Sequence, residues 1–73
     1  MKKPKIVSEE DFREAYETYV NGNKKDFVKS INDWIREGFD MVSILTHMDN
    51  VCREYRAKPM RLLIYYFTMK DNV

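Results

Sequence analysis

The stretch that most constrains the fold of this chain is residues 59–69, Pro-Met-Arg-Leu-Leu-Ile-Tyr-Tyr-Phe-Thr-Met. From Leu62 to Phe67, six large apolar or aromatic side chains follow one another without a charge. In a helix these side chains point in every direction around the axis, and such a helix is normally buried against several neighbours. The sequence therefore predicts a central, apolar last helix, with the three earlier segments packed around it.

Three amphipathic patterns with helical spacing come before this stretch. An N-cap residue opens each pattern, a glycine ends the first two, and Pro59 disfavours helical geometry in the residue before it. The N-cap residues are Ser8, Asn23 and Asp40, and the glycines are Gly22 and Gly38. The sequence predicts a compact all-α domain of four helices, over residues 8–21, 23–37, 40–56 and 59–70.

One alternative concerns the last element. Residues 62–68 are rich in strand-favouring side chains and could instead form a strand. The chain offers no second convincing strand as a partner, so this strand would have to pair with another subunit. A helix is the preferred interpretation.

The length and charge of the chain suit one small domain. Residues 1–7 form a basic arm that we expect to be flexible, and residues 8–73 form the single helical domain. The lone cysteine, Cys52, allows no internal disulfide, and no apolar run reaches the length of a signal peptide or a membrane span. We expect a cytoplasmic protein, and the net charge of +1 gives no overall attraction to nucleic acid or membrane.

Catalytic patterns are weak in this sequence. His47 is the single histidine and stands five residues before Cys52, so on one helix the two side chains point apart. We expect His47 to be exposed and Cys52 to be a small core residue. A cluster of acidic residues is expected to form a solvated helix face: Glu9, Glu10, Asp11, Glu14 and Glu17. No catalytic residue, metal site or cofactor is predicted, and we expect no enzyme activity.

A basic cluster lies where the third and fourth predicted helices meet. It consists of Arg53, Arg56, Lys58 and Arg61, and only Glu54 opposes it, which leaves a local charge of +3. Basic residues near the start of a helix can bind an anion together with free backbone N–H groups. The cluster is a candidate contact for nucleic-acid phosphates or for an acidic partner protein. An ordinary cationic edge is the alternative.

Residues 50–66 resemble a helix-turn-helix motif, a likeness that covers less than a quarter of the chain. In that likeness the buried or anchoring positions are Val51, Cys52, Tyr55, Ala57, Leu62 and Tyr65. The resemblance implies that Lys58, Met60 and Arg61 face the major groove, with Arg56 near a phosphate. The chain departs from the motif at the turn, where Arg56 replaces the usual glycine and a left-handed conformation costs about 1 kcal/mol.

The apolar surface of the last helix gives a second hypothesis. Three short helices are expected to leave part of it uncovered, with Leu63, Tyr66 and Phe67 as a protein interface and a homodimer as the simplest form. We therefore predict a small non-enzymatic interaction protein (an adaptor, regulator or inhibitor) that binds a protein partner within nucleic-acid machinery. The alternative is a DNA- or RNA-binding regulator that uses residues 50–66. No membrane or small-molecule substrate is expected.

Overall fold

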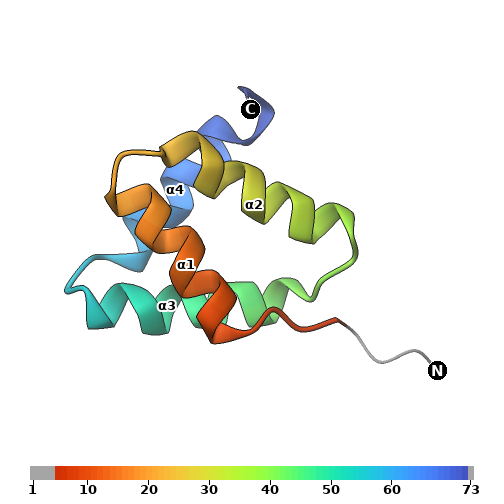
Figure 1. The fold of residues 1–73 in the computed structure, drawn as a ribbon, viewed down its shortest axis with the longest axis horizontal. Helices are drawn as coiled ribbons and strands as arrows, with labels where there is room; N and C mark the ends of the chain where they lie inside the picture. The colour runs from red at the N-terminus through yellow and green to blue at the C-terminus, as the bar shows by residue number, and fades with distance from the viewer. Residues whose placement is uncertain (1–4, 73) are drawn as a thin grey trace.

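The structure, a computed structural model, describes residues 5–72, which form four α-helices and a short 3₁₀ turn. The helices are α1 Glu9–Val20, α2 Lys24–Arg36, α3 Met41–Glu54 and α4 Pro59–Met69, and η1 Lys70–Asn72 follows (Figure 1). This confirms the predicted all-α, four-helix domain, with boundaries within two residues of those expected. Residues 62–68 belong to α4, so the strand alternative is wrong. Residues 1–4 of the predicted arm and Val73 lie outside the described residues.

Local side-chain chemistry explains where α1 begins. The Ser8 hydroxyl accepts a hydrogen bond of 3.1 Å from the Asp11 N–H, which satisfies one of the free donors of the first turn. Val7 and Phe12, on either side of this cap, are 1% and 0% exposed. Their spacing is that of a hydrophobic staple, which fixes the direction in which the chain enters the helix.

Residues 5–7 are docked on the domain, although the sequence placed them in a flexible arm. The Asp40 N–H donates a hydrogen bond of 2.6 Å to the Lys5 carbonyl. The Val7 carbonyl lies 2.6 Å from Nε2 of His47 in α3, and the Val7 side chain is part of the core. The expectation of a flexible segment is therefore wrong for these residues, because they make specific backbone hydrogen bonds and bury an apolar side chain.

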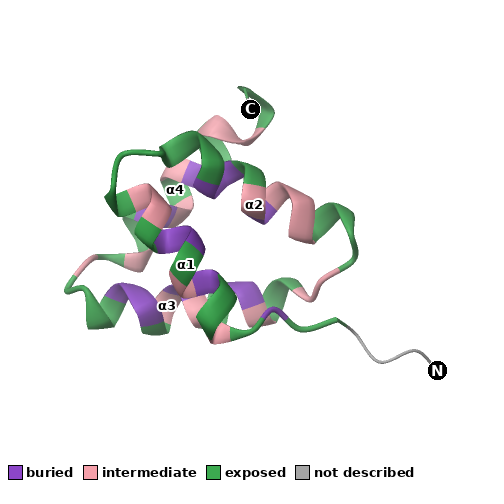
Figure 2. Ribbon diagram, in the orientation of Figure 1, coloured by how far each residue is buried: buried purple, intermediate pink, exposed green. Residues whose placement is uncertain are grey.

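The helix that joins the domain together is α1, not the last helix. In Figure 1, α2 and α3 lie on opposite sides of the molecule and α1, which packs against both, runs between them. α4 packs mainly against α3 and η1, and its fully buried residues are Leu62 and Tyr66 (Figure 2). The last helix is therefore not the central one, and its neighbours leave Met60, Ile64 and Phe67 exposed.

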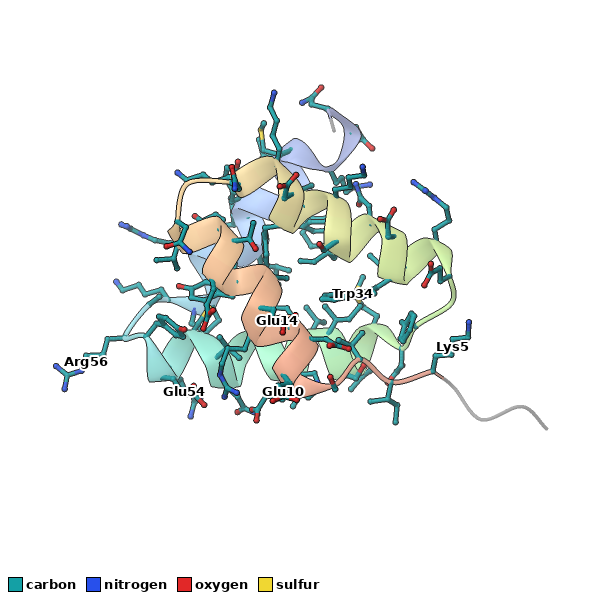
Figure 3. The ribbon with its side chains drawn as sticks, viewed as in Figure 1. Lys5, Glu10, Glu14, Trp34, Glu54 and Arg56 are labelled. Carbon is teal, nitrogen blue, oxygen red and sulfur yellow. The ribbon has the colours of Figure 1, made fainter. Side chains whose placement is uncertain are left out.

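Aromatic rings fill much of the space between α1 and α2. The Phe12 ring meets the Phe27 ring edge-on, with 6.1 Å between centroids, and lies 6.2 Å from the Trp34 ring. Trp34 is half-buried, packs against the core and occupies the space between α2 and α3 (Figure 3). Trp34 is therefore part of the packing around the core. Such ring pairs contribute about 0.5–1.5 kcal/mol beyond the area that they bury.

The first three helices end on the same backbone motif. In each, the residue after the C-cap is left-handed and the next residue donates its N–H to a carbonyl five residues back, as in a Schellman motif. The left-handed residues are Gly22 (φ 105), Gly38 (φ 89) and Arg56 (φ 56). The hydrogen bonds run from Asn23 to Thr18 (2.9 Å), from Phe39 to Trp34 (2.9 Å) and from Ala57 to Cys52 (2.8 Å). Because the motif turns the chain sharply, α2 packs back on α1 and α4 on α3, whereas α3 packs on α1.

Candidate functional site

The basic cluster predicted from the sequence is divided in the structure. Arg53, in the last turn of α3, is bonded to Asp49 with an Nε–Oδ2 distance of 3.2 Å. Arg56 and Lys58 lie in the α3–α4 turn, and Arg61 follows in the first turn of α4. None of the ion pairs in residues 5–72 includes these three side chains. The candidate anion site therefore consists of three cations, and Arg53 is not one of them.

Arg56 occupies the strained position of this turn. Its φ of 56° is the single positive value at a non-glycine residue within the described part of the chain. A left-handed conformation costs a residue with a Cβ about 1–2 kcal/mol, whereas glycine adopts it freely. Strained backbone of this kind is concentrated at functional sites, so this turn is a candidate functional site. Figure 3 shows the Arg56 side chain extending from the turn into solvent.

The acidic side chains near this turn are already engaged. Glu54 receives two hydrogen bonds from Nη2 of Arg13 in α1, at 2.8 and 3.1 Å. The hydrogen bond with Glu54 and the charge of its carboxylate raise the pKa of the Arg13 guanidinium. Glu17 accepts a hydrogen bond of 3.2 Å from the Tyr55 hydroxyl. The charge of Glu54 is therefore compensated by Arg13, whereas Glu17 is bonded to a neutral hydroxyl and keeps its negative charge.

A hollow of about 360 Å³ opens between α1 and the α3–α4 turn. Its walls carry these three cations together with aromatic and apolar side chains of the core. The lining residues are Tyr16, Tyr19, Arg56, Ala57, Lys58, Arg61 and Leu62. The volume lies at the lower end of the range of small-ligand sites, about 300–1,000 Å³. Most of the basic cluster that the sequence singled out therefore lines one concave site.

Backbone donors add little to this site. Pro59 has no N–H, and the Arg61 N–H donates a hydrogen bond of 3.2 Å to the Lys58 carbonyl. Among residues 59–61, Met60 therefore holds the one N–H without a backbone partner in the described part of the chain. An anion at this helix start would therefore be bound mainly by side chains. The sequence had suggested that free backbone N–H groups would contribute as well.

The apolar interface predicted on α4 is partly wrong. Phe67 is 51% exposed, as an interface residue should be, but Leu63 is half-buried and Tyr66 is 3% exposed. The Tyr66 hydroxyl donates a hydrogen bond of 2.5 Å to Oδ1 of Asn32 in α2, so this residue belongs to the core. The face that remains open consists of Met60, Ile64 and Phe67, which we call the α4 stripe.

The α4 stripe follows one side of the helix. Met60, Ile64 and Phe67 stand at positions i, i+4 and i+7, and Met60 and Ile64 are 64% and 58% exposed. The spacing was visible in the sequence, but an uninterrupted apolar run contains no polar residue to mark which face points outward. The Asn32–Tyr66 hydrogen bond orients α4 and leaves the stripe on the opposite side.

Cys52 and His47, the residues weighed as catalytic candidates, lie in environments typical of structural residues. Cys52 is buried as predicted, and burial raises the pKa of its thiol, with a smaller contribution from the Asp49 charge, so it is not a thiolate at neutral pH. His47 was expected to be exposed, but it is half-buried against the Val7 carbonyl, and its Nδ1 has no hydrogen-bond partner within residues 5–72. No group of three potential metal ligands occurs in residues 5–72.

The burial of residues 51–65 fits the helix-turn-helix likeness except at Tyr55, which the likeness placed among the buried or anchoring positions. Val51, Cys52 and Leu62 are buried, Ala57 and Tyr65 pack half-buried against the core, and Tyr55 is 40% exposed. The left-handed residue falls at Arg56, where the resemblance required it. The face of α4 opposite its buried residues is apolar, whereas a helix in the major groove contacts base edges chiefly through polar side chains.

Comparisons of the chain with protein-family models, curated proteins and solved structures gave no match. Within residues 5–72, none of the helices has the length and apolar character needed to cross a bilayer.

Proposed function

We propose that the protein is a small non-enzymatic interaction module, an adaptor, regulator or inhibitor, that binds a partner protein through α4. The observation that carries this proposal is the α4 stripe, three large apolar side chains that are each more than half exposed along one helix face. Contiguous apolar surface of this kind usually marks a protein interface, whereas single exposed apolar residues do not.

The charge around the stripe supports an acidic partner. α4 contains no acidic residue, and Arg56, Lys58 and Arg61 gather at its N-terminal end. A partner segment with an apolar face and flanking carboxylates would match both features, because opposite charges bring partners together and fix their orientation. The partner that we propose is therefore an acidic, amphipathic segment of another protein.

A cytoplasmic setting within nucleic-acid machinery is part of the proposal. The buried, unpaired Cys52 is compatible with a reducing compartment. The second candidate function, a DNA- or RNA-binding regulator, is supported by the left-handed Arg56 in a helix-turn-helix-like turn. We place it second because the α4 stripe would put apolar side chains against a polar groove.

A synthetic amphipathic helical peptide, with a Leu/Phe face and flanking Glu residues, tests the proposal. Titrated into isotope-labelled protein, it should shift the amide NMR signals of α4 with micromolar affinity. Ile64→Gln should weaken binding at least tenfold. Val42→Gln is the matched control, since Val42 is also exposed, at 67%, but lies on α3. Both substitutions should leave stability unchanged within about 0.5 kcal/mol, because both sites face solvent.

Three outcomes would overturn this function. Equal affinities of the two variants would show that the stripe is not the contact surface. A dimer in sedimentation that Ile64→Gln dissociates would show that a second copy of the chain covers the stripe. Tight duplex DNA or RNA binding, with an affinity that falls steeply as salt rises, would favour the second candidate.

A further inference from the structure

The hollow at the α3–α4 turn combines a deep polar group with a charged rim. Tyr16 lines it and is 4% exposed, and its hydroxyl makes no hydrogen bond to nitrogen or oxygen within residues 5–72. Its polar neighbour is the thiol of Cys52, which is a weak hydrogen-bond partner. Burial, with a smaller effect of Cys52, raises the pKa of Tyr16, so its hydroxyl stays protonated at neutral pH.

The rim of the hollow carries enough positive charge to bind a ligand with more than one negative charge. Arg56, Lys58 and Arg61 all line it, and no carboxylate pairs with them in the described part of the chain. A carboxylate ligand would balance one of the three charges. A phosphate monoester carries about −1.5 to −2 charges at pH 7 and three strong acceptor oxygens. It therefore matches three cationic donors better than a carboxylate does.

The geometry points to the following site: we propose that this hollow binds the phosphoryl group of a phosphorylated side chain on the partner protein. The inference rests on the proposed function in one respect, that the partner is a protein. The position of the hollow supports this choice, because Met60 of the α4 stripe lies in sequence between Pro59 and the rim residue Arg61. One partner segment could place its phosphate in the hollow and its apolar side chains on the stripe.

The walls of the hollow favour a phosphate carried on an apolar or aromatic group. Tyr16, Tyr19 and Leu62 supply apolar surface beneath the cationic rim. Arg61 belongs to α4 itself, whereas the Arg56 side chain extends into solvent and has to turn inward to reach the anion. Lys58 and Arg61 are therefore expected to make the larger contributions, and Arg56 a smaller one.

Phenyl phosphate is the probe that tests the hollow without a partner. We expect it to shift the amide NMR signals of residues 56–62, and to bind at least fivefold more tightly than phenyl sulfate, a monoanion of similar shape. Binding should weaken from pH 7 to pH 5, because the second phosphate pKa is about 6. Arg61→Gln and Lys58→Gln should each weaken it at least fivefold. Arg53→Gln is the control, since it removes the same charge from a residue outside the hollow.

Arg56→Gly separates loss of binding from loss of structure. Glycine relieves the left-handed strain, so this variant should be at least as stable as the parent while binding phenyl phosphate about twofold more weakly. Phenyl phosphate shifts that do not respond to Arg61→Gln and Lys58→Gln, or equal affinity for phenyl sulfate, would overturn the inference.

Peptides distinguish this inference from the proposed function. The acidic amphipathic peptide should bind at least tenfold more tightly when it carries one phosphotyrosine. Ile64→Gln should weaken the binding of that peptide and leave phenyl phosphate binding unchanged. If the stripe contact alone were wrong, the peptide would bind the parent protein and Ile64→Gln with equal affinity. A 5′-phosphorylated oligonucleotide that binds more tightly than the phosphopeptide would overturn the choice of a protein phosphate.

Discussion

Nη2 of Arg13 lies 2.8 and 3.1 Å from the two carboxylate oxygens of Glu54, so a single guanidinium joins α1 to the end of α3. Glu54 is the acidic residue within the basic cluster at 53–61. Its engagement with Arg13 compensates the charge that would otherwise oppose the cations of the hollow. Figure 3 shows Glu54 on α3 and Arg56 projecting from the turn that follows it.

Arg13→Gln should therefore weaken phenyl phosphate binding, although Arg13 does not line the hollow. The substitution leaves the Glu54 charge uncompensated, and a unit charge about 10 Å from an anion in a water-like medium changes its affinity about twofold. Glu54→Gln should change the affinity in the opposite direction. Arg36→Gln, which breaks an exposed Arg36–Asp33 pair on α2, is the matched control. Affinities that rise in Arg13→Gln would contradict this account.

Docking of the N-terminal residues makes a prediction about stability. Val7→Ala should lower the free energy of unfolding by about 1–3 kcal/mol, because Val7 is 1% exposed and its removal leaves a cavity in the core. Ile6→Ala is the control, since Ile6 is 66% exposed and its truncation should cost less than about 0.5 kcal/mol. Urea titrations of both variants measure the difference. Equal midpoints would mean that residues 5–7 do not dock.

The Tyr66–Asn32 hydrogen bond, which orients α4, can be removed by deleting a single hydroxyl group. Tyr66→Phe leaves Oδ1 of Asn32 without its donor at 2.5 Å and should cost about 1 kcal/mol. For a domain of this size the loss corresponds to about 4–8 °C in Tm. Tyr65→Phe is the control, because the Tyr65 hydroxyl makes none of the hydrogen bonds found in residues 5–72. A Tm change of similar size in both variants would show that the bond does not orient α4.

The parts of the fold that could be predicted from the sequence depend on neighbouring residues. Ser8, Gly22 and Gly38 act on backbone groups within a few positions, so the helix ends could be located closely. The turn at Arg56 is local in the same way, and the helix-turn-helix spacing indicated its left-handed conformation. Three of the four predicted basic residues lie together for this reason, since one short turn places them.

The features that were missed depend on residues far apart in the chain. His47 is half-buried because Val7, 40 residues earlier, returns to cover it. Tyr66 is buried because Asn32, 34 residues earlier, provides an acceptor. An apolar run such as residues 62–67 fits several rotations of the helix about its axis. Only the tertiary contact decides which apolar residues stay exposed.

The buried hydroxyls predict how stability changes at high pH. Burial raises the pKa of Tyr16 and of Tyr66, and the Asp71 charge adds a smaller increase at Tyr66. In the unfolded chain these hydroxyls ionise near the ordinary value of about 10. The native state therefore holds more protons than the unfolded state above this pH. Stability from these groups is fully present below about pH 10 and is lost as pH rises through the folded pKa values.

Tyrosinate absorbance and circular dichroism, followed together from pH 8 to about pH 12, measure this loss. The last tyrosines to ionise should do so as the helical signal falls, because their ionised forms are not accommodated in the core. Tyr66→Phe, although less stable at pH 8, should lose less additional stability at high pH than the parent, since one of the responsible groups is gone. Complete ionisation of all five tyrosines near pH 10 with an unchanged helical signal would contradict the burial of Tyr16 and Tyr66.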